Sequence, residues 1–449
     1  MRGRFGYRGA LALSVCALTV AACGGGSDNG GGGGSSSSSS SGSGSSGGAT
    51  QQQTKGAKAI DPNSMNGAKG NVTYCVGKDT TGATHAWIKA FNAKNTGVKV
   101  TIREFPPSAD AQRTQFIQRQ QAKSGECDVF SSDVIWTAEF ASQKWLYDMT
   151  PYIAKRKADF IGAPIQTVTY EGKQWGVPES TDAGFLYYNK DKIKQAPSTW
   201  QDVYNTAKSN GGIVYQGAAY EGLTCDYLEL LFAAGGQVLN ADGSKSAINS
   251  PAAVNALKLM VDGIKAGAAP KAVTTYMEPE SLAAWQTGKY AYMRNWPYAY
   301  AASNNDKGSK IKDKFAVIPQ PSFQGAGKGG VLGGHNSVIS VYSKNPGAAL
   351  AVVDYNTSLE NNVRNAAQFS LAPVLTAAYD DAKVKKALPF SDQLKQAVAQ
   401  AKARPVSPVY PQISQAIYNN VNDALAGRTS PEDAMKKASD SIDKALATF

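Results

Sequence analysis

Between residues 71 and 144 the sequence alternates strand-like with helix-like segments, and this alternation limits the choice of fold more than any other feature. The segment 71–76 is followed by a helical pattern at 84–92, and the alternating segment 98–102 by a Gln-rich helical stretch at 110–122. A third pair, 127–130 and 136–144, repeats the order. Strands that alternate with helices predict a parallel sheet with right-handed crossovers.

In such a sheet, ligands bind beyond the carboxyl ends of the strands. Two loops follow predicted strands in this way, 77–82 and 131–133. Asp133 closes the second loop and is therefore a candidate ligand contact. It is equally suited to be the N-cap of the helix that follows, and the sequence leaves both roles open.

The pattern continues through the rest of a chain of 449 residues, which is too long for one ordinary domain and favours two lobes. Strand-like segments lie at 186–189, 291–293, 315–318 and 338–342. Helix-like segments lie at 200–208, 227–234, 251–266, 348–358, 412–425 and 431–446. The helical periodicity is clearest at 251–266, which begins with a proline suited to a first turn.

The N-terminus has the order of a secretory signal. Arg2, Arg4 and Arg8 precede an apolar run at 10–22, which is shorter than the about 20 residues that a membrane-spanning helix needs. Small residues then precede Cys23, as at a signal cleavage site. Residues 24–48 are almost wholly Gly and Ser and cannot form a core. We therefore expect a signal peptide at 1–22 and a flexible tether at 23–60.

The charge and the motif content argue against several classes of function. The formal net charge is +11, but the lysines are dispersed and no basic cluster with interleaved aromatics is found, so we expect no nucleic-acid partner. A positive surface would suit an anionic envelope. The sequence has only two histidines and no H-E-x-x-H, P-loop or dinucleotide motif, so we expect no enzyme, no metal and no cofactor. A glycosidase that uses Asp133 and Asp182 as its carboxylate pair stays open.

Three cysteines remain after residue 23. Cys75 and Cys127 lie in two strand-like segments, and they could form a disulfide if those strands are neighbours, which would leave Cys225 unpaired. Three buried free thiols are the alternative.

Several segments carry a family resemblance in their order along the chain. They are Trp175-Gly176-Val177-Pro178, Thr181-Asp182-Ala183-Gly184, Leu186-Tyr187-Tyr188-Asn189-Lys190-Asp191, Pro197-Ser198-Thr199-Trp200, Gly235-Gly236, Gly288-Lys289-Tyr290-Ala291-Tyr292-Met293, Gly333-Gly334-His335-Asn336 and Arg404-Pro405. Together they resemble the extracellular solute-binding family 1 of carbohydrate importers, and within it the maltose- and trehalose-binding proteins. Val20-Ala21-Ala22-Cys23 resembles the lipobox of bacterial lipoproteins.

The resemblance implies an α/β fold of the periplasmic-binding-protein type II, with two lobes joined by a multi-segment hinge. Each lobe would be a mainly parallel sheet flanked by helices, the first formed by 61–183 and 325–373 and the second by 184–324 and 374–449. The protein would be a monomer that is lipidated at Cys23 and anchored to the outer face of the cell membrane. It would close around a sugar such as trehalose or maltose and deliver it to the permease subunits of an ABC importer.

A sugar presents apolar C–H faces and a rim of hydroxyls, so its site needs aromatic plates and planar polar groups. The resemblance places Asp182, Trp296, Gly333, Gly334 and Arg404 in the cleft, with Asp133 and Trp136 contributed by the first lobe. Asp182 would accept from hydroxyls, Trp296 would stack on a pyranose face and Arg404 would donate to oxygens. The backbone of Gly333 and Gly334 would approach the sugar where a Cβ would clash.

Each of these residues also has a purely structural interpretation. Trp296 could be a core aromatic, Arg404 a partner of a surface carboxylate, Asp182 a turn residue and Gly333-Gly334 a plain loop. His335 stands where relatives often carry an aromatic, which leaves a second stacking plate open. Iron, a polyamine or a peptide are alternative cargoes, although Tyr187 and Tyr188 would point to opposite faces of a strand. Arg404 in the cleft would argue against a polyamine.

Overall fold

The computed structural model describes residues 53–94, 97–325 and 329–448. The predicted signal peptide, Cys23 and most of the predicted tether lie outside these residues. The described segments belong to one unit that begins at Gln52. No helix in them is long and apolar enough to cross a membrane.

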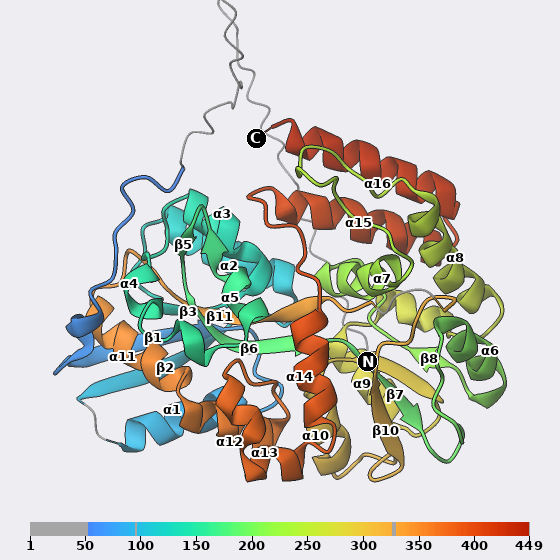
Figure 1. Cartoon of the computed structure of the whole chain (residues 1–449), viewed down its shortest axis with the longest axis horizontal. Helices are drawn as coiled ribbons and strands as arrows, with labels where there is room; N and C mark the ends of the chain where they lie inside the picture. The colour runs from blue at the N-terminus through green and yellow to red at the C-terminus, as the bar shows by residue number, and fades with distance from the viewer. Residues whose placement is uncertain (1–52, 95–96, 326–328, 449) are drawn as a thin grey trace, which may run out of the picture. The chain divides into compact units, whose positions relative to one another are not determined.

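Two mixed sheets organise this unit, and helices cover both (Figure 1). Among the described residues the first sheet has the strand order β2-β1-β3-β11-β6 and the second the order β10-β7-β9-β8. The strands of the first sheet are β1 (Gly70–Val76), β2 (Val98–Glu104), β3 (Val129–Asp133), β6 (Val177–Ala183) and β11 (Leu332–Ile339). Those of the second are β7 (Phe185–Asn189), β8 (Ile213–Val214), β9 (Tyr292–Asn295) and β10 (Phe315–Pro319), and β4 (Thr169–Tyr170) pairs with β5 (Lys173–Gln174) in a separate hairpin.

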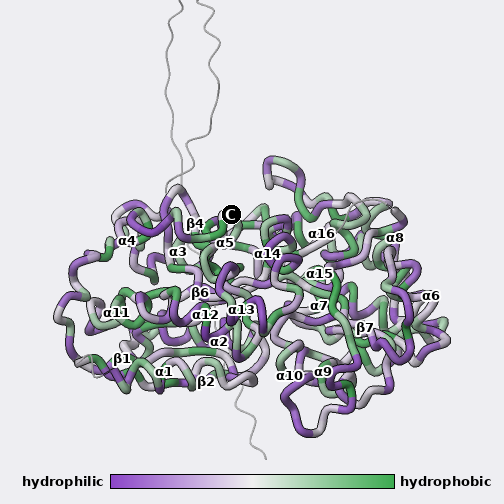
Figure 2. The backbone as a smooth tube through the Cα atoms, turned by 60° about the horizontal axis from the view of Figure 1, so that its bottom comes forward, coloured by the Kyte–Doolittle hydropathy of each residue, from purple (hydrophilic) through white to green (hydrophobic). Residues whose placement is uncertain are grey.

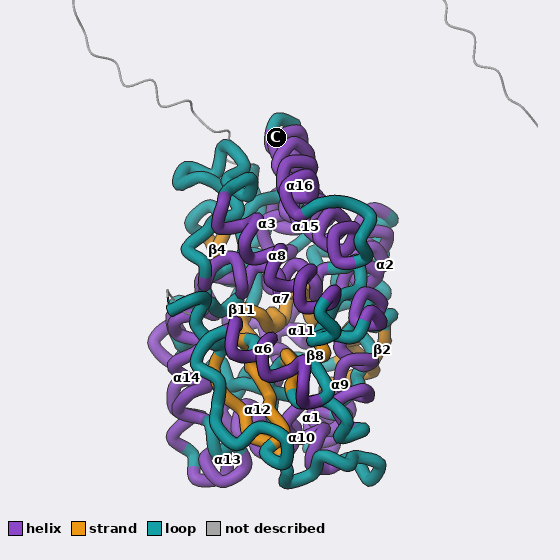
Figure 3. The backbone as a smooth tube through the Cα atoms, turned by 90° about the vertical axis from the view of Figure 1, so that its right-hand side faces the viewer, coloured by secondary structure: helices purple, strands orange, loops and turns teal. Residues whose placement is uncertain are grey.

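The helices surround the strands in the side view (Figure 3). Beside the first sheet lie α1 (Ala83–Ala93), α2 (Ala109–Gln121), α3 (Thr137–Ser142), α4 (Thr150–Ile153), α5 (Gly162–Thr167), α11 (Pro346–Asn356), α12 (Leu359–Phe369) and α13 (Ala382–Ala387). Beside the second lie α6 (Trp200–Asn210), α7 (Glu221–Ala233), α8 (Pro251–Lys265), α9 (Glu278–Gln286), α10 (Ala299–Asn305), α15 (Tyr410–Leu425) and α16 (Pro431–Leu446). The 3-10 turns are η1 (Pro62–Met65), η2 (Val134–Trp136), η3 (Lys157–Asp159), η4 (Lys271–Thr275) and η5 (Thr376–Asp380), and α14 (Ser391–Gln400) contacts both β6 and β10.

The expectation of mainly parallel sheets is wrong. β1 pairs in parallel with β2 and β3, as the strand–helix alternation predicts, but β11 runs antiparallel to both β3 and β6. In the second sheet only β8 and β9 are parallel. The reason is the route of the chain. β6 leaves the first sheet and continues directly into β7, whereas β11 returns after the second sheet is complete and therefore enters in the opposite direction.

The packing of the chain also differs from the predicted boundaries of the tether and the second lobe. Ordered contacts begin before residue 60, since Thr54 donates its backbone N–H to Glu171 at 2.9 Å and Ile60 is buried. η5 and α13 pack against α12 beside the first sheet, so the chain passes to the second sheet only around α14 and not at residue 374.

Apolar side chains from strands and inward helix faces form the core, and hydrophilic stretches gather in the outer loops and helices (Figure 2). A second apolar cluster lies around Phe116, Phe130 and Phe140. There a disulfide joins Cys75 on β1 to Cys127 just before β3, with 5.8 Å between their Cα atoms. Because β1 and β3 are neighbours, the two cysteines reach each other without distortion of the sheet. Cys225 on α7 is free and buried.

Candidate functional site

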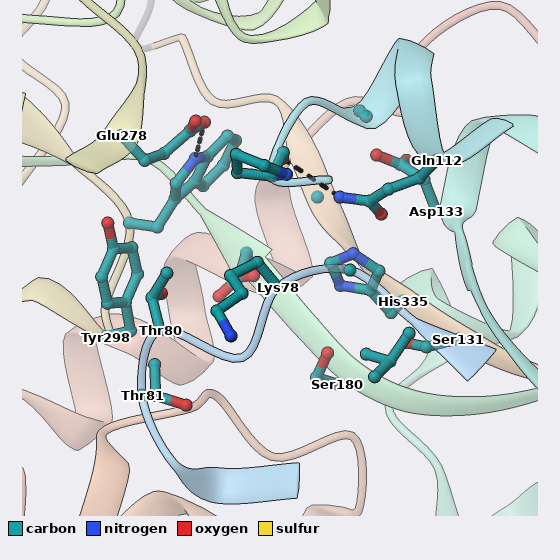
Figure 4. A pocket seen from close by; sticks show the side chains of 18 of the residues that line it. Lys78, Thr80, Thr81, Gln112, Ser131, Asp133, Ser180, Glu278, Tyr298 and His335 are labelled. Carbon is teal, nitrogen blue, oxygen red and sulfur yellow. Dashed lines mark hydrogen bonds between the residues drawn. The ribbon is translucent and has the colours of Figure 1, made fainter. Parts of the chain in front are cut away.

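A cavity of about 290 Å³ lies where the two sheets meet, close to the smallest size of typical ligand pockets. Its first-sheet side comes from the loop after β1, the start of α2 and the ends of β3 and β6, and its second-sheet side from the starts of α7 and α9 and the end of β9. Figure 4 shows Lys78, Thr80, Gln112, Ser131, Glu278, Tyr298 and His335 around this space. Both segments expected beyond strand ends contribute to its lining, although 131–133 belongs to the end of β3 itself and only 77–82 follows its strand as a loop.

Trp296 presents its ring to the cavity directly after the end of β9. Its indole Nε1–H donates to Glu278 Oε1 at 3.2 Å, and its backbone N–H donates to Asn295 Oδ1 at 2.8 Å. Its carbonyl accepts from the buried Tyr187 hydroxyl at 2.7 Å. The side chain and the backbone of Trp296 are therefore both held in place before any ligand arrives.

A buried charge cluster lies behind this indole. The Arg294 guanidinium is 4.0 Å from the ring centroid of Trp296, and only 2% of the Arg294 residue surface is exposed. Arg294 pairs with Asp226 at 2.9 Å and donates from Nε to Glu229 at 2.8 Å. These carboxylates raise the pKa of Arg294 and outweigh the opposing effect of its burial, so it stays charged.

Gly184 explains how this cluster fits beneath the crossing from β6 to β7. A Cβ built at position 184 would collide with the Glu229 carboxylate and with the Arg294 guanidinium. The absence of a side chain at Gly184 therefore makes room for the buried ion pair that supports Trp296.

Asp182 lines the cavity from β6, where it lies in register with Gly333 of β11. No hydrogen bond to its carboxyl group is found among the described residues. Burial raises its pKa to about 8, and the negative charge of Asp133 adds to the rise, while Arg294 opposes it. Asp182 is thus a half-buried carboxyl group that faces the cavity and has no hydrogen-bond partner in the described part of the chain.

Asp133 is the N-cap that the sequence suggested, while its other suggested role, as a ligand contact, stays a prediction. Its Oδ1 accepts from the backbone N–H of Ile135 at 3.2 Å and caps η2, and the same oxygen lies 3.4 Å from Arg404 Nη2. The residue also lines the cavity.

Arg404 lies at the cavity but uses most of its donors on the protein. It is 6% exposed, and its Nη1 donates to Glu221 Oε1 at 2.6 Å. Its Nη2 reaches Asp133 and the carbonyl of Leu332, so one guanidinium connects α7 of the second-sheet side to β3 and β11 of the first sheet. Its Nε–H is buried without a partner in the described part of the chain.

Glu221 is the main partner of Arg404. Burial raises the pKa of Glu221 to about 7, and Arg404 limits this rise. The Tyr410 hydroxyl donates to the same carboxylate at 2.7 Å. The expectation that Arg404 simply donates to a ligand is therefore incomplete, since the guanidinium also neutralises a buried carboxylate.

The two glycines of the 333–334 pair line the cavity on strand β11, but protein contacts account for the absence of a Cβ at each. A Cβ at Gly333 would lie 3.1 Å from the Trp296 ring. Gly334 has φ of +114°, and a Cβ there would collide with the backbone of Ser180 on β6. The expected close approach of a sugar to these glycines stays a prediction.

Trp136 does not line the cavity, which corrects its assignment to the site. It is 3% exposed and packs in the second apolar cluster, with 5.8 Å between its ring centroid and that of Phe140. The η2 turn that Asp133 caps carries Trp136 under α3, where a large apolar surface leaves water.

Sequence reasoning missed Tyr220, Glu221 and Glu278 at the cavity. Glu221 and Glu278 lie in the first turns of α7 and α9, and Tyr220 immediately precedes α7. The Tyr220 hydroxyl donates to Glu278 Oε2 at 2.6 Å. The rule that ligands bind beyond the carboxyl ends of strands would have found Glu221 if it had been applied to the loop that follows β8.

Two further carboxylates at the cavity already accept hydrogen bonds from the protein. Asp79 accepts from the backbone N–H of Gly82 at 2.7 Å and of His85 at 3.2 Å, so it serves as a cap for α1. The Glu179 carboxylate accepts from Tyr74, Ser131, Ser337 and Asn356. No group of three or more metal-ligating side chains with the geometry of a metal site is present in the described residues.

Comparison with known proteins places these features in a family context. The model of the bacterial extracellular solute-binding proteins matches residues 77–363. A probable ABC transporter-binding protein of Deinococcus radiodurans is 38% identical over 365 residues, which cover 77% of this chain and 86% of that protein. The maltose-bound structure of MalE3 from T. maritima is similar with a TM-score of 0.79 at 35% identity, covering 84% of this chain and 99% of that one. An ABC transporter solute-binding protein from Thermotoga lettingae, bound with α-D-tagatose, gives a TM-score of 0.77 at 26% identity, with coverage of 84% and 99%.

Proposed function

We propose, from the premise that this chain belongs to the family of bacterial extracellular solute-binding proteins, that its cavity captures a neutral sugar and delivers it to the permease of an ABC importer. The family consists of binding proteins and not of enzymes.

One observation carries the choice of a sugar. The same cavity holds an indole face fixed from behind by Arg294 and, beside it, the unpartnered carboxyl group of Asp182. An aromatic face packs against the C–H face of a pyranose, and the oxygen atoms of a carboxyl group accept hydrogen bonds from hydroxyl groups. Asp182 and Trp296 would therefore recognise the two chemical surfaces that a sugar presents.

The mechanism that follows is conformational. The cavity walls come from both sheets, so a solute that contacts both favours the closed arrangement over the open one. Arg404 would stabilise the same arrangement, because it contacts Asp133 on one side and Glu221 on the other. Asp133, Gly333 and Gly334 would form the remaining walls, and no covalent step is needed.

The relatives support a sugar but differ in what they bind. The solved structures named above hold maltose and α-D-tagatose. We propose a disaccharide, with maltose or trehalose first, on the likeness to the maltose-bound protein.

The proposed setting is the outer face of the cell membrane. Residues 1–22 would be removed as a signal peptide, Cys23 would carry lipid, and the Gly/Ser-rich segment would tether a monomer near its permease.

A cationic solute is the second candidate, and one observation favours it. Arg404 was the reason to reject a polyamine, but it is already neutralised by Glu221 and Asp133. The carboxyl groups of Asp182 and Glu278 therefore face the cavity without a free positive charge next to them in the described residues.

A thermal-shift screen followed by calorimetric titration tests the proposal. The panel contains maltose, trehalose, monosaccharides, alditols and spermidine, and the solute is recovered afterwards and analysed. We expect saturable binding of a neutral sugar that is recovered intact. Preference for spermidine would favour the second candidate, and release of monosaccharide at enzymatic rates would contradict a binding protein.

A further inference from the structure

Lysines gather at the end of the second sheet that lies away from the crossing at Gly184. β7 begins next to this crossing and ends at Asn189, so the loops beyond Asn189 belong to the far end. Lys190, Lys192 and Lys194 follow β7 directly. Lys289 precedes β9, and Lys307, Lys310, Lys312 and Lys314 precede β10. We call these eight side chains the lysine face.

Backbone hydrogen bonds hold the three loops side by side. The N–H of Lys190 donates to the carbonyl of Lys314 at 2.7 Å. The N–H of Lys310 donates to Gln286 at 2.8 Å, which brings its loop against the turn that contains Lys289. The lysines are distant in sequence but share one surface.

The charge of this surface is not neutralised locally. All eight lysines except Lys192 are exposed, and only the aspartates Asp191, Asp306 and Asp313 lie in the same loops. None of the eight forms an ion pair with any described residue. The loop after α10 is drawn in the hydrophilic colour in Figure 2.

We propose that the lysine face adsorbs to a bilayer surface rich in anionic lipid headgroups. Lysines near such a surface are attracted to it one by one, over about a Debye length, without a shaped pocket. The lysine face has the matching composition, because its loops contain no arginine and no exposed large apolar side chain. A protein partner would be expected to meet aromatic or arginine anchors instead.

None of the lysines lines the cavity, so adsorption and sugar capture are separable. This inference therefore goes beyond the proposed function and does not depend on the identity of the solute. Adsorption would keep the second lobe close to the membrane while the tether holds the first.

Vesicle co-sedimentation tests the proposal. The full chain with Cys23→Ser, so that no lipid is attached, is mixed with phosphatidylglycerol vesicles or with phosphatidylcholine vesicles at low and high salt. The test variant carries Lys190→Glu, Lys194→Glu, Lys312→Glu and Lys314→Glu. The control carries Lys383→Glu, Lys386→Glu, Lys436→Glu and Lys437→Glu, which change the net charge equally on exposed positions of α13 and α16.

We expect the wild-type chain and the control to bind the anionic vesicles in a salt-dependent way, and the test variant to bind at least tenfold more weakly with its melting temperature unchanged. Equal loss in both variants would assign binding to net charge and overturn the proposal. Absence of wild-type binding to anionic vesicles would also overturn it. If the wild-type chain does not bind anionic vesicles, but sugar uptake by cells fails with the test variant and not with the control, the lysine face would be assigned to an acidic protein partner.

Discussion

The guanidinium of Arg294 lies 4.0 Å from the centroid of the Trp296 indole, on a ring that also lines the cavity. Two residues earlier in the chain than Trp296, Arg294 is fixed by Asp226, Glu229 and Gln216. A cation against an aromatic face adds attraction to simple packing, and more so when water is absent. The proposed binding plate is thus rigid because a buried charge cluster supports it.

Replacing the plate should weaken capture without unfolding the protein. Trp296→Ala removes the aromatic face, and we expect a loss of about 1–3 kcal/mol in sugar binding, measured by calorimetric titration. Trp145→Ala is the matched control, because Trp145 is also half-buried but lies outside the cavity. Equal affinity in wild type and Trp296→Ala would refute the placement of the sugar.

Removing the support should cost more in stability than removing the plate. Arg294→Met leaves Asp226 and Glu229 buried without their cation, and we expect the free energy of unfolding to fall by about 3–5 kcal/mol in urea denaturation. Arg428→Met breaks an exposed pair with Asp423 and should change it by less than about 1 kcal/mol. Similar small effects of both substitutions would show that the buried cluster is not a support.

Because the pKa of Asp182 is raised, the effect of Asp182→Asn on the free energy of unfolding should depend on pH. The group is ionised above about pH 4 in the unfolded chain but only above about pH 8 in the folded chain. Its ionisation therefore opposes folding increasingly from pH 4 to pH 8 and by a constant amount above pH 8. Asp182→Asn should raise the free energy of unfolding by about 1–3 kcal/mol at pH 8.5, and by much less at pH 4.

Chemical denaturation of both proteins at several pH values measures this difference. Asp262→Asn, on an exposed position of α8, serves as control and should show no such growth with pH. A pH-independent effect of Asp182→Asn would contradict the raised pKa of Asp182.

Arg404→Met should destabilise the protein chiefly through Glu221. In the wild type the pKa of Glu221 is about 7, so its ionisation reduces stability between pH 4.5 and pH 7 and no further above that. Without Arg404 the pKa of Glu221 rises higher, so the variant should lose more stability than the wild type from pH 7 to pH 9. We expect a loss of about 3–5 kcal/mol at pH 9. Parallel pH profiles of thermal unfolding would contradict this role.

Local sequence patterns were sufficient to predict much of the framework. The three strand–helix pairs before residue 144 exist, and α16 has the bounds expected from its helix-like pattern. The direction of β11 could not be predicted, because it depends on where the chain goes between β6 and β11. From sequence, Gly333 and Gly334 could also be a plain loop. Two glycines can be assigned to a strand only when the strand that pairs with them is known, which here is β6.

The sequence indicated some of the residues that line the cavity and not others, and each difference has a physical cause. Trp296 and Asp182 were expected in the cavity and line it, whereas Trp136 joined the core because sequence gives no sign of which way a short turn rotates a side chain. Arg404 was expected to serve a ligand, but its ion pair with Glu221 depends on a contact across nearly half of the chain. Glu278 was missed because its position opposite the indole is set by tertiary packing alone.

The most direct test of the account is the proton NMR spectrum of a bound sugar. We predict that sugar C–H resonances shift upfield on binding to the wild-type chain, because the sugar face lies in the ring current of the Trp296 indole, and that the shift disappears in Trp296→Leu. Sugar that binds without an upfield shift, or that shows the same shift with Trp296→Leu, would contradict the claim that this indole is the binding plate.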